Sequence, residues 1–322
     1  MLTLPFYRPV LKGLEEVQER LRRLAQEVDD PRLAPLFAHP MEVPGKRVRP
    51  TLTLLAGRLT PFGQDKVSLM ATAVELLHIA TLVHDDTVDK AEVRRGRATL
   101  FKLFGPQVAV LVGDYLFATS AVLVCETGHL GVVKRFAETI MDLATGELQE
   151  HLSLGQWPQT REQYFQRIYR KTASLFRTAG EAGAVLCGAP EEWVAALREY
   201  GYALGMAFQI VDDILDVDGV GEEVGKPVGN DLKEGVLTLP AILLLERYPE
   251  DNPILPLLRG EEPEANLARA LQMMRTSGVL QEAHGIAQGM LQRARAALAP
   301  LPPGECKECL LALADYVVER RR

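Results

Sequence analysis

The sequence predicts an all-α protein, a bundle of ten or more helices. Apolar residues recur with the 3.6-residue period of an amphipathic helix over most of the chain, and the alternating pattern of strands is nearly absent. Prolines and glycines gather in short stretches between the periodic segments. None of these stretches is long enough, or simple enough in composition, to act as a flexible linker. We therefore expect a single domain that covers residues 1–322.

The periodic segments place the individual helices in order. The first is an amphipathic helix whose apolar stripe runs from Leu14 to Val28. Further helices are expected at residues 50–58, 66–89, 106–125, 132–152, 160–186, 191–217, 237–247, 265–276, 279–298 and 307–319. Thr160 and Gln163 have the spacing of a capping box, which strengthens the start of the helix that follows them.

Composition and charge exclude several classes of protein. With 47% apolar residues in 322, the chain can bury a sizeable core. A net charge of −7 without a basic stripe argues against nucleic-acid binding. The N-terminus lacks the features of a secretory signal, and Glu75 and His78 interrupt the longest apolar stretch, so we expect no transmembrane segment. Cys306 and Cys309 form a Cys-x-x-Cys pair that no second pair completes into a zinc site. These features favour a cytoplasmic protein.

Two aspartate motifs of one pattern carry the chemistry. Asp85-Asp86-Thr87-Val88-Asp89 and Asp212-Asp213-Ile214-Leu215-Asp216 each place two carboxylates four residues apart. Residues at this spacing share a helix face, so the carboxylates repel one another and require cations. Magnesium takes one or two carboxylates and completes its shell with phosphate oxygens. The motifs therefore predict a magnesium site that binds a diphosphate.

A series of further motifs accompanies the aspartates. In chain order they are GKRVRP at 45–50, ELLH at 75–78, RRG at 94–96, GD at 113–114, KT at 171–172, GMAFQ at 205–209 and GKPVGNDL at 225–232. With the two aspartate motifs, this series resembles the trans-isoprenyl diphosphate synthases, of the long-chain type such as octaprenyl diphosphate synthase. The resemblance implies the isoprenoid synthase fold around a deep central cavity, and usually a homodimer. It also implies repeated condensation of isopentenyl diphosphate with an allylic prenyl diphosphate.

The chemistry of ionisation assigns roles to the carboxylates. An allylic diphosphate ionises when fixed cations stabilise the charge on its leaving group. Asp85 and Asp89 are the expected ligands on one helix and Asp212 on the other, with Asp86, Asp213 and Asp216 as ligands or supports. The resemblance implies three magnesium ions.

The resemblance also implies roles for the basic and polar residues. Lys46, Arg49, His78 and Arg95 would hold isopentenyl diphosphate, while Arg94, Lys171 and Lys226 would face the allylic diphosphate. Thr172 and Gln209 would stabilise an allylic carbocation through their oxygen dipoles. A histidine such as His78 is also often only a core residue, and the run from Lys46 to Arg49 is also compatible with a solvated basic surface; His84 we interpret as structural. The chain has Val236 where the family commonly has a lysine, and Lys233 is a possible substitute.

Product length is predicted from the helix before the first motif. Each helical turn rises about 5.4 Å, close to one extended isoprene unit, so residues below the aspartates can measure the product. Short-chain members of the family have an aromatic residue four or five positions before the first aspartate, or an insertion in the motif. Here those positions are Thr81 and Ala80, with Leu77 a turn deeper. We predict a product between hexaprenyl and decaprenyl; the alternative is that Ala80 only packs against a neighbouring helix.

Three alternatives remain. A shorter-chain synthase would make geranylgeranyl or farnesyl diphosphate. A terpene cyclase would share the fold and the first motif, but would normally replace the second motif, which this chain retains. A noncatalytic partner subunit should have degraded aspartate motifs. A lipid product would also bring the protein transiently to the membrane surface.

Overall fold

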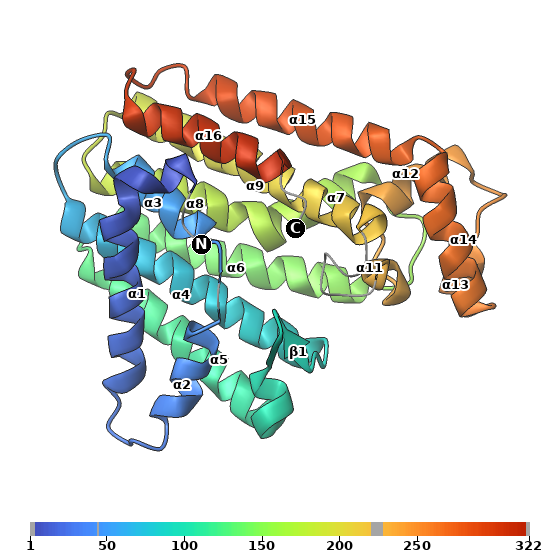
Figure 1. The fold of residues 1–322 in the computed structure, drawn as a ribbon, viewed down its shortest axis with the longest axis horizontal. Helices are drawn as coiled ribbons and strands as arrows, with labels where there is room; N and C mark the ends of the chain where they lie inside the picture. Colours follow the sequence, from blue (N-terminus) through green and yellow to red (C-terminus); the bar gives the residue numbers. More distant parts are fainter. Residues whose placement is uncertain (1–3, 44, 220–227, 320–322) are drawn as a thin grey trace. The chain divides into compact units, whose positions relative to one another are not determined.

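The protein is all-α, as predicted (Figure 1). The computed structural model describes residues 4–43, 45–219 and 228–319. The chain divides into two compact units: the first comprises Met1–Glu138, Thr178–Arg198 and Pro300–Ala312, and the second Thr139–Arg177, Glu199–Ala299 and Leu313–Arg322. The assignment of the chain to a single domain and the deep central cavity stay predictions.

The first unit contains the N-terminal helices and one small hairpin. Its elements are η1 (Pro5–Val10), α1 (Leu11–Gln26), α2 (Ala34–Met41), α3 (Val48–Gly57), α4 (Gln64–Val88), β1 (Val93–Arg94), β2 (Arg97–Ala98), α5 (Leu100–Glu126) and parts of α6 (Leu130–Leu152), α8 (Ser174–Leu186), α9 (Glu191–Asp218) and α16 (Glu305–Glu319). Helix α4 packs along α5 and against α3 and α1 (Figure 1). The first aspartate motif lies at the C-terminal end of α4, which fixes it to this core.

A glycine allows α4 and α5 to approach closely. A Cβ on Gly113 would lie 2.1 Å from Nε2 of His84, so only glycine fits opposite this imidazole. His84 also lies 3.2 Å from the carbonyl oxygen of Val110, and its ring stacks on Phe117. These contacts support the structural interpretation of His84.

The described residues include two helices that are long and apolar enough to span a membrane by length and composition, α4 and α5. The expectation that Glu75 and His78 make α4 too polar for such a span is therefore wrong, while the expected lack of a transmembrane segment stays a prediction. In α4, 72% of the apolar window is buried inside the protein, as in the core helix of a globular fold, whereas in α5 the share is 39%. Burial of Glu75 within α4 fits a core helix, because this carboxylate pairs with an arginine of the same unit.

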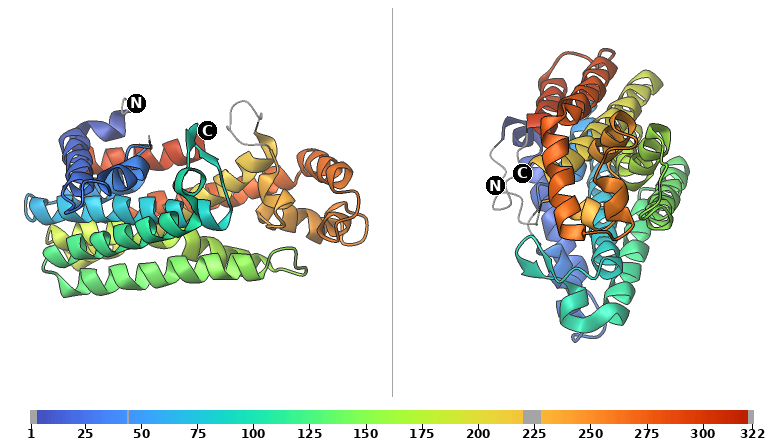
Figure 2. Two further views of the ribbon diagram at one scale, coloured as in Figure 1. Left: turned by 90° about the horizontal axis from the view of Figure 1, so that it is seen from below. Right: turned by 90° about the vertical axis from the view of Figure 1, so that its right-hand side faces the viewer.

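The second unit is built around the C-terminal half of α9 (Figure 2). Its elements are the remainders of α6, α8, α9 and α16, together with α7 (Arg161–Ile168), η2 (Tyr169–Ala173), α11 (Asn230–Lys233), α12 (Leu239–Arg247), α13 (Ile254–Leu258), α14 (Pro263–Thr276) and α15 (Val279–Ala297). Met206, Ile210 and Ile214 of α9 are buried together with the whole stretch from Leu239 to Leu245. This core holds the stripe of α9 that carries the second aspartate motif.

The structure differs from the predicted elements in a few places. Helices α2, α11 and α13 are too short to show a clear period, and the hairpin was not expected. Helix α5 begins at Leu100 and is interrupted at Gly105, whose φ of 82° is non-helical, so that the predicted start at Pro106 matches its second part. The predicted helix 160–186 contains a π-helical segment, η2. The capping box at Thr160 is confirmed.

Candidate active site

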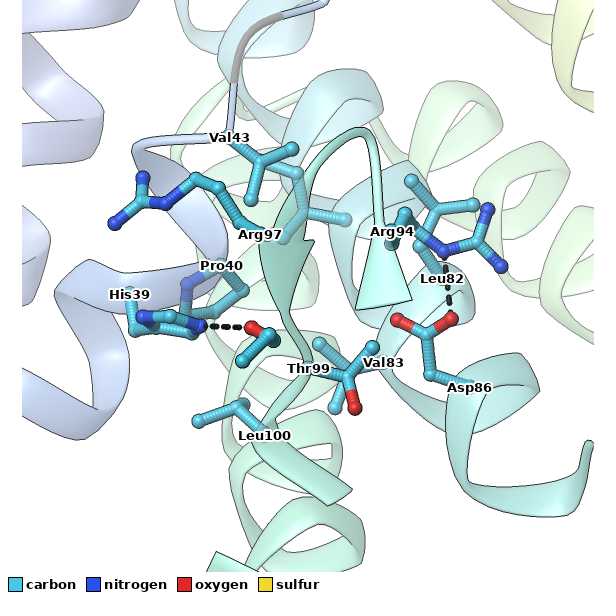
Figure 3. Close-up of a pocket in the computed structure, with 12 residues that line it drawn as sticks. His39, Pro40, Val43, Leu82, Val83, Asp86, Arg94, Arg97, Thr99 and Leu100 are labelled. Atoms are coloured by element: carbon cyan, nitrogen blue, oxygen red, sulfur yellow. Dashed lines mark hydrogen bonds and ion pairs between the residues drawn. The ribbon is translucent and has the colours of Figure 1, made fainter. Parts of the chain in front are cut away.

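The first aspartate motif presents three carboxylates in different environments. Asp85 is half-buried and Asp89, which caps the C-terminus of α4, is exposed. Asp86 is buried, and Nε of Arg94 donates to its Oδ1 at 2.6 Å (Figure 3). The motif therefore directs one carboxylate toward the hairpin and leaves Asp85 and Asp89 on a more accessible face. Arg94, predicted to face an allylic diphosphate, is engaged by Asp86.

A pocket lies beside this ion pair (Figure 3). Helix α4 lines it with Ile79, Leu82 and Val83, and Arg97 and Thr99 contribute from the hairpin side. Leu77, Ala80 and Thr81, the residues predicted to set product length, are not among the residues that line this pocket.

The residues predicted to hold isopentenyl diphosphate gather in the first unit. Gly45 lies against Arg95, because a Cβ on Gly45 would be 2.9 Å from Nη1 of Arg95. Burial holds the pKa of His78 well below its usual value of 6.5, and the positive charges of Arg49, Arg95, Arg94 and Arg47 lower this pKa further. His78 is therefore a neutral imidazole beside a concentration of positive charge, which suits a diphosphate.

A network that the motifs alone did not reveal supports this basic cluster. Arg47 precedes α3 in the left-handed conformation, with φ of 50°. Its guanidinium forms an ion pair with Glu75 of α4 and donates to Oε1 of Gln18 at 2.9 Å. The hydroxyl of Tyr7 donates to the carbonyl oxygen of Lys46 at 2.5 Å. The backbone of the exposed Lys46 is thus hydrogen-bonded to η1, while the side chain of Arg47 is bound by α1 and α4.

The second aspartate motif repeats the arrangement of the first. Asp212 is exposed, and Asp216 is half-buried and accepts the backbone N–H groups of Asn230 and Asp231 at 3.2 and 3.3 Å. Asp213 is only 3% exposed. Burial raises the pKa of Asp213 to about 7, although hydrogen bonds from Tyr164 and Gln209 oppose the shift. Two carboxylates of this motif are therefore accessible, and the third, Asp213, is buried and hydrogen-bonded inside the second unit.

The regular α-helical geometry breaks where Lys171 and Thr172 lie. These residues belong to η2, a π-helical turn, and π-helical turns are common at functional sites. Nζ of Lys171 contacts Oε2 of Glu147 at 3.1 Å and Oε1 of Glu150 at 2.5 Å. The hydroxyl of Thr172 donates to Oε1 of Gln209 at 2.7 Å. The structure thus brings together Lys171, Thr172, Gln209 and Asp213 in the second unit.

The remaining candidate residues are located as follows. Leu77 and Ala80 are fully buried in α4 and Thr81 is half-buried, with its hydroxyl donating to the carbonyl oxygen of His78. Lys226 lies outside the described residues. Val236, which occupies the position of the usual lysine, is half-buried, and Lys233 is exposed. The assigned roles of all these residues, and the arrangement of both aspartate motifs around one diphosphate, stay predictions.

Among the residues that the structure describes, no group of three or more His, Cys, Asp or Glu side chains is arranged to hold a metal ion by itself. The donor sets nevertheless suit magnesium. Each motif offers two accessible carboxylates four residues apart, and Mg²⁺ typically takes one or two carboxylates while substrate phosphates and water supply the other oxygens. Asp85 and Asp89, and Asp212 and Asp216, are the residues that would hold it.

Comparison with known proteins places the chain in a family. The sequence pattern of the polyprenyl synthetase family matches residues 30–274. The chain belongs to the polyprenyl synthetase family. It is accordingly a trans-prenyltransferase of isoprenoid biosynthesis, as predicted.

Relatives of the family cover nearly the whole chain. A prenyl transferase of a Synechocystis species is 38% identical over 99% of this chain and 98% of its own. Heptaprenyl diphosphate synthase component 2 of Geobacillus stearothermophilus is 35% identical over 95% of each chain. A short chain isoprenyl diphosphate synthase of Methanothermobacter thermautotrophicus is 34% identical over 96% of this chain and 97% of its own.

Solved structures of polyprenyl synthetases share the fold. A decaprenyl diphosphate synthase from Rhodobacter capsulatus is 38% identical, with a TM-score of 0.92 over 98% of both chains. A polyprenyl synthase from Caulobacter crescentus, complexed with calcium and isoprenyl diphosphate, is 36% identical, with a TM-score of 0.92 over 99% of this chain and 98% of its own. The isoprenoid synthase fold implied by the motifs is therefore confirmed.

Proposed function

We propose that this polyprenyl synthetase condenses isopentenyl diphosphate repeatedly with an allylic prenyl diphosphate and releases a long-chain all-trans polyprenyl diphosphate. The observation that carries the proposal is the basic cluster around His78. An elongating synthase needs a second anion site for isopentenyl diphosphate beside its aspartate motifs, and Lys46, Arg49, His78 and Arg95 supply the chemistry of such a site.

Each part of the site has a distinct task in this reaction. The guanidinium groups of Arg49 and Arg95 make charge-assisted hydrogen bonds to the diphosphate of isopentenyl diphosphate, and neutral His78 contributes an N–H donor. Arg94 and Lys171 contact the allylic diphosphate. The oxygen dipoles of Thr172 and Gln209 stabilise the allylic carbocation until the double bond of isopentenyl diphosphate attacks it and a proton is lost.

Magnesium completes the site. We propose three Mg²⁺ ions held by Asp85, Asp89, Asp212 and Asp216. When bound, the ions supply the positive charge that stabilises the departing diphosphate. The Caulobacter crescentus relative, which was solved as a complex with both calcium and isoprenyl diphosphate, supports a divalent metal in the proposed site.

The long product is supported by the small residues before the first motif. Ala80 and Thr81 place no aromatic ring one turn below the aspartates, and the motif has no insertion. Relatives named for heptaprenyl and decaprenyl products also support a product between hexaprenyl and decaprenyl. A relative named for short chains, at similar identity, favours the alternative of a geranylgeranyl or farnesyl product.

One assay tests the function. Purified protein is mixed with isopentenyl diphosphate, an allylic primer and Mg²⁺, and the extracted products are separated by chromatography. We expect a ladder that ends between six and ten isoprene units, and we expect Asp85→Ala and Asp212→Ala to abolish it while circular dichroism remains helical. Cyclic hydrocarbons would instead identify a terpene cyclase. No product with any primer would identify a noncatalytic subunit.

We also propose that the protein is a homodimer that works in the cytoplasm. Leu111, Tyr115 and Val122 are exposed on the part of α5 that follows Gly105, at spacings of four and seven residues, so they form one apolar stripe. A second copy of the chain would cover this stripe. Because one relative is named component 2 of a synthase, light scattering of the purified chain decides the matter: an inactive monomer that gains activity with a second protein would contradict the homodimer.

A further inference from the structure

We propose that Tyr164 and Asp213 are positioning residues of the reaction. Together they fix the orientation of the Gln209 side-chain amide, and through it they force the Thr172 hydroxyl to donate its proton away from the carbocation. This inference rests on the proposed function, because it assigns the two residues a task in carbocation stabilisation. It gives the buried carboxylate of the second motif a role other than metal binding.

Three hydrogen bonds connect these four side chains in one line. The hydroxyl of Tyr164 donates to Oδ2 of Asp213 at 2.6 Å. Nε2 of Gln209 donates to Oδ1 of the same carboxyl group at 2.8 Å. The hydroxyl of Thr172 then donates to Oε1 of Gln209 at 2.7 Å. We name this line, from Tyr164 through Asp213 and Gln209 to Thr172, the hydrogen-bond relay.

With Asp213 ionised, the hydrogen-bonding capacities of the groups give the relay one direction. An ionised carboxylate is an acceptor on both oxygens, so Asp213 then takes donors from both Tyr164 and Gln209. Gln209 must therefore present its NH₂ group to Asp213, which leaves its carbonyl oxygen toward Thr172. A hydroxyl has a single proton, and Thr172 uses it on Gln209. The lone pairs of the Thr172 oxygen are what remains to face a positive charge.

Burial makes the relay rigid. Tyr164 is 0% exposed, Asp213 3% and Thr172 5%. A buried polar group that loses its partner costs about 1–3 kcal/mol, so Tyr164, Asp213 and Thr172 are held to their neighbours, and the half-buried Gln209 is held between Asp213 and Thr172. A threonine within a helix usually donates to the carbonyl oxygen one turn earlier, whereas Thr172 donates to a side chain of α9.

The backbone around the relay is shaped to bring its members together. A Cβ on Gly205 would lie 2.6 Å from Cα of Ala173, so glycine is required where α9 passes the π-helical turn. A Cβ on Gly146 would lie 2.7 Å from the backbone nitrogen of Lys171, so α6 approaches the same turn from its own side. Gly205, Gln209 and Asp213 follow one another at intervals of four on one face of α9. The close approach at Gly205 therefore sets the distance at which Gln209 meets Thr172.

The direction of the relay matters for the carbocation. Oxygen lone pairs stabilise a neighbouring positive charge, while a hydroxyl proton directed at the same charge opposes it. Loss of the Tyr164 hydroxyl removes one of the two donors that hold Asp213 and releases the orientation of Gln209. The consequence is a slower ionisation step with little change in the binding of either diphosphate.

The test compares two tyrosine variants under the assay described above. Tyr164→Phe removes the relay's terminal hydroxyl, and Tyr200→Phe is the matched control, because Tyr200 is also 0% exposed in the second unit but lies outside the relay. We expect Tyr164→Phe to lower kcat by roughly ten- to a hundredfold at unchanged KM for both substrates, since a small misplacement of catalytic groups can cost about a hundredfold. Tyr200→Phe should retain the kcat of the wild type. Equal kcat values in the two variants would overturn the proposal.

A double-mutant cycle separates positioning from general damage. If Tyr164 acts through Thr172, Tyr164→Phe should lower kcat little further in a Thr172→Val background, whereas independent effects multiply. Multiplying effects would overturn the relay. Asp213→Asn tests the same link without relying on Tyr164: its amide presents a donor where the relay needs an acceptor, and we expect a loss of kcat at least as large as in Tyr164→Phe. Wild-type kcat in Asp213→Asn would also overturn it.

Different results would refute the proposed function and the proposed role of the relay. A wild-type protein that makes no prenyl product with any primer refutes the proposed function. A wild-type protein that elongates normally, with Tyr164→Phe as active as Tyr200→Phe, refutes only the relay. The thermal midpoints of both variants, measured beside kcat, show whether the two substitutions cost similar stability.

Discussion

Replacing Ala80 with Phe should shorten the product of this synthase. Ala80 lies five residues before Asp85 on helix α4, so its side chain is about 7.5 Å along the helix axis from the first aspartate. A chain that grows along this face away from the aspartates would meet the phenyl ring after one or two turns. We expect elongation to stop at three or four isoprene units.

A second substitution, deeper on the same face of α4, tests the same prediction. Ala73 lies seven residues before Ala80, so it shares its helix face within about 20° and is about 10 Å deeper. Ala73 is fully buried as well. If one turn corresponds to one isoprene unit, Ala73→Phe should stop elongation about two units later than Ala80→Phe.

The matched control is a third buried alanine of α4. Ala71 is 0% exposed, as Ala80 is, but lies nine residues away and therefore on the opposite helix face. Ala71→Phe adds the same volume to the same helix. Inserting a ring into a packed core typically costs about 1–3 kcal/mol, and all three variants should lose stability of this order. Only the two on the predicted face should change product length.

Chromatography of the extracted products, calibrated with prenyl standards, measures the outcome. The reasoning is refuted if Ala80→Phe makes the product of the wild type, or if Ala71→Phe shortens the product as much. In either case Ala80 only packs against a neighbouring helix, and product length is determined elsewhere.

Three further predictions concern charge. Glu75→Gln should raise KM for isopentenyl diphosphate, measured by steady-state kinetics, and should lower stability by about 2 kcal/mol, because the half-buried Arg47 loses the charge of its ion-pair partner. The free energy of unfolding should fall as the pH drops from about 7 to 5, because unfolded His78 binds a proton below about pH 6.5 while folded His78 stays neutral. His78 alone can contribute at most about 1.4 kcal/mol per pH unit. His78→Gln should therefore reduce the dependence of stability on pH, measured by urea unfolding. Chelation of divalent metal should abolish binding of an allylic diphosphate but preserve binding of isopentenyl diphosphate, each measured by calorimetry.

The long helices and the site motifs could be predicted because their signals are local. A helical period over ten or more residues identifies an element, and a pair of aspartates four apart is a property of a single helix. The hairpin around Arg95 was missed because its strands have two residues each. Its turn places Arg95 at φ of 49° and Gly96 at φ of 76°, a tight turn that a short Arg-Arg-Gly sequence does not distinguish from a loop.

The residues that hydrogen-bond to the site residues could not be predicted, because these contacts join segments that are distant in the sequence. Tyr164 lies 49 residues from Asp213, and Gln18 lies 29 residues from Arg47. In the sequence, Tyr164 is one aromatic residue of an amphipathic helix and Gln18 is one polar residue of another. Three residues of each motif look equivalent in sequence, yet Asp86 and Asp213 are buried and hydrogen-bonded while Asp89 and Asp212 are exposed. Only tertiary structure separates these roles.

The different surroundings of the cations explain why the two substrates should differ in their need for metal. Arg94 is paired with Asp86, and Lys171 with Glu147 and Glu150, so carboxylates already balance the charges intended for the allylic diphosphate. In the proposed site, the allylic diphosphate would also meet the carboxylates of the aspartate motifs, so we expect its binding to require added divalent charge. Around His78, burial is the main cause of the lowered pKa of the imidazole, and the positive charges of Arg49 and Arg95 lower this pKa further. We therefore expect isopentenyl diphosphate to bind there without metal.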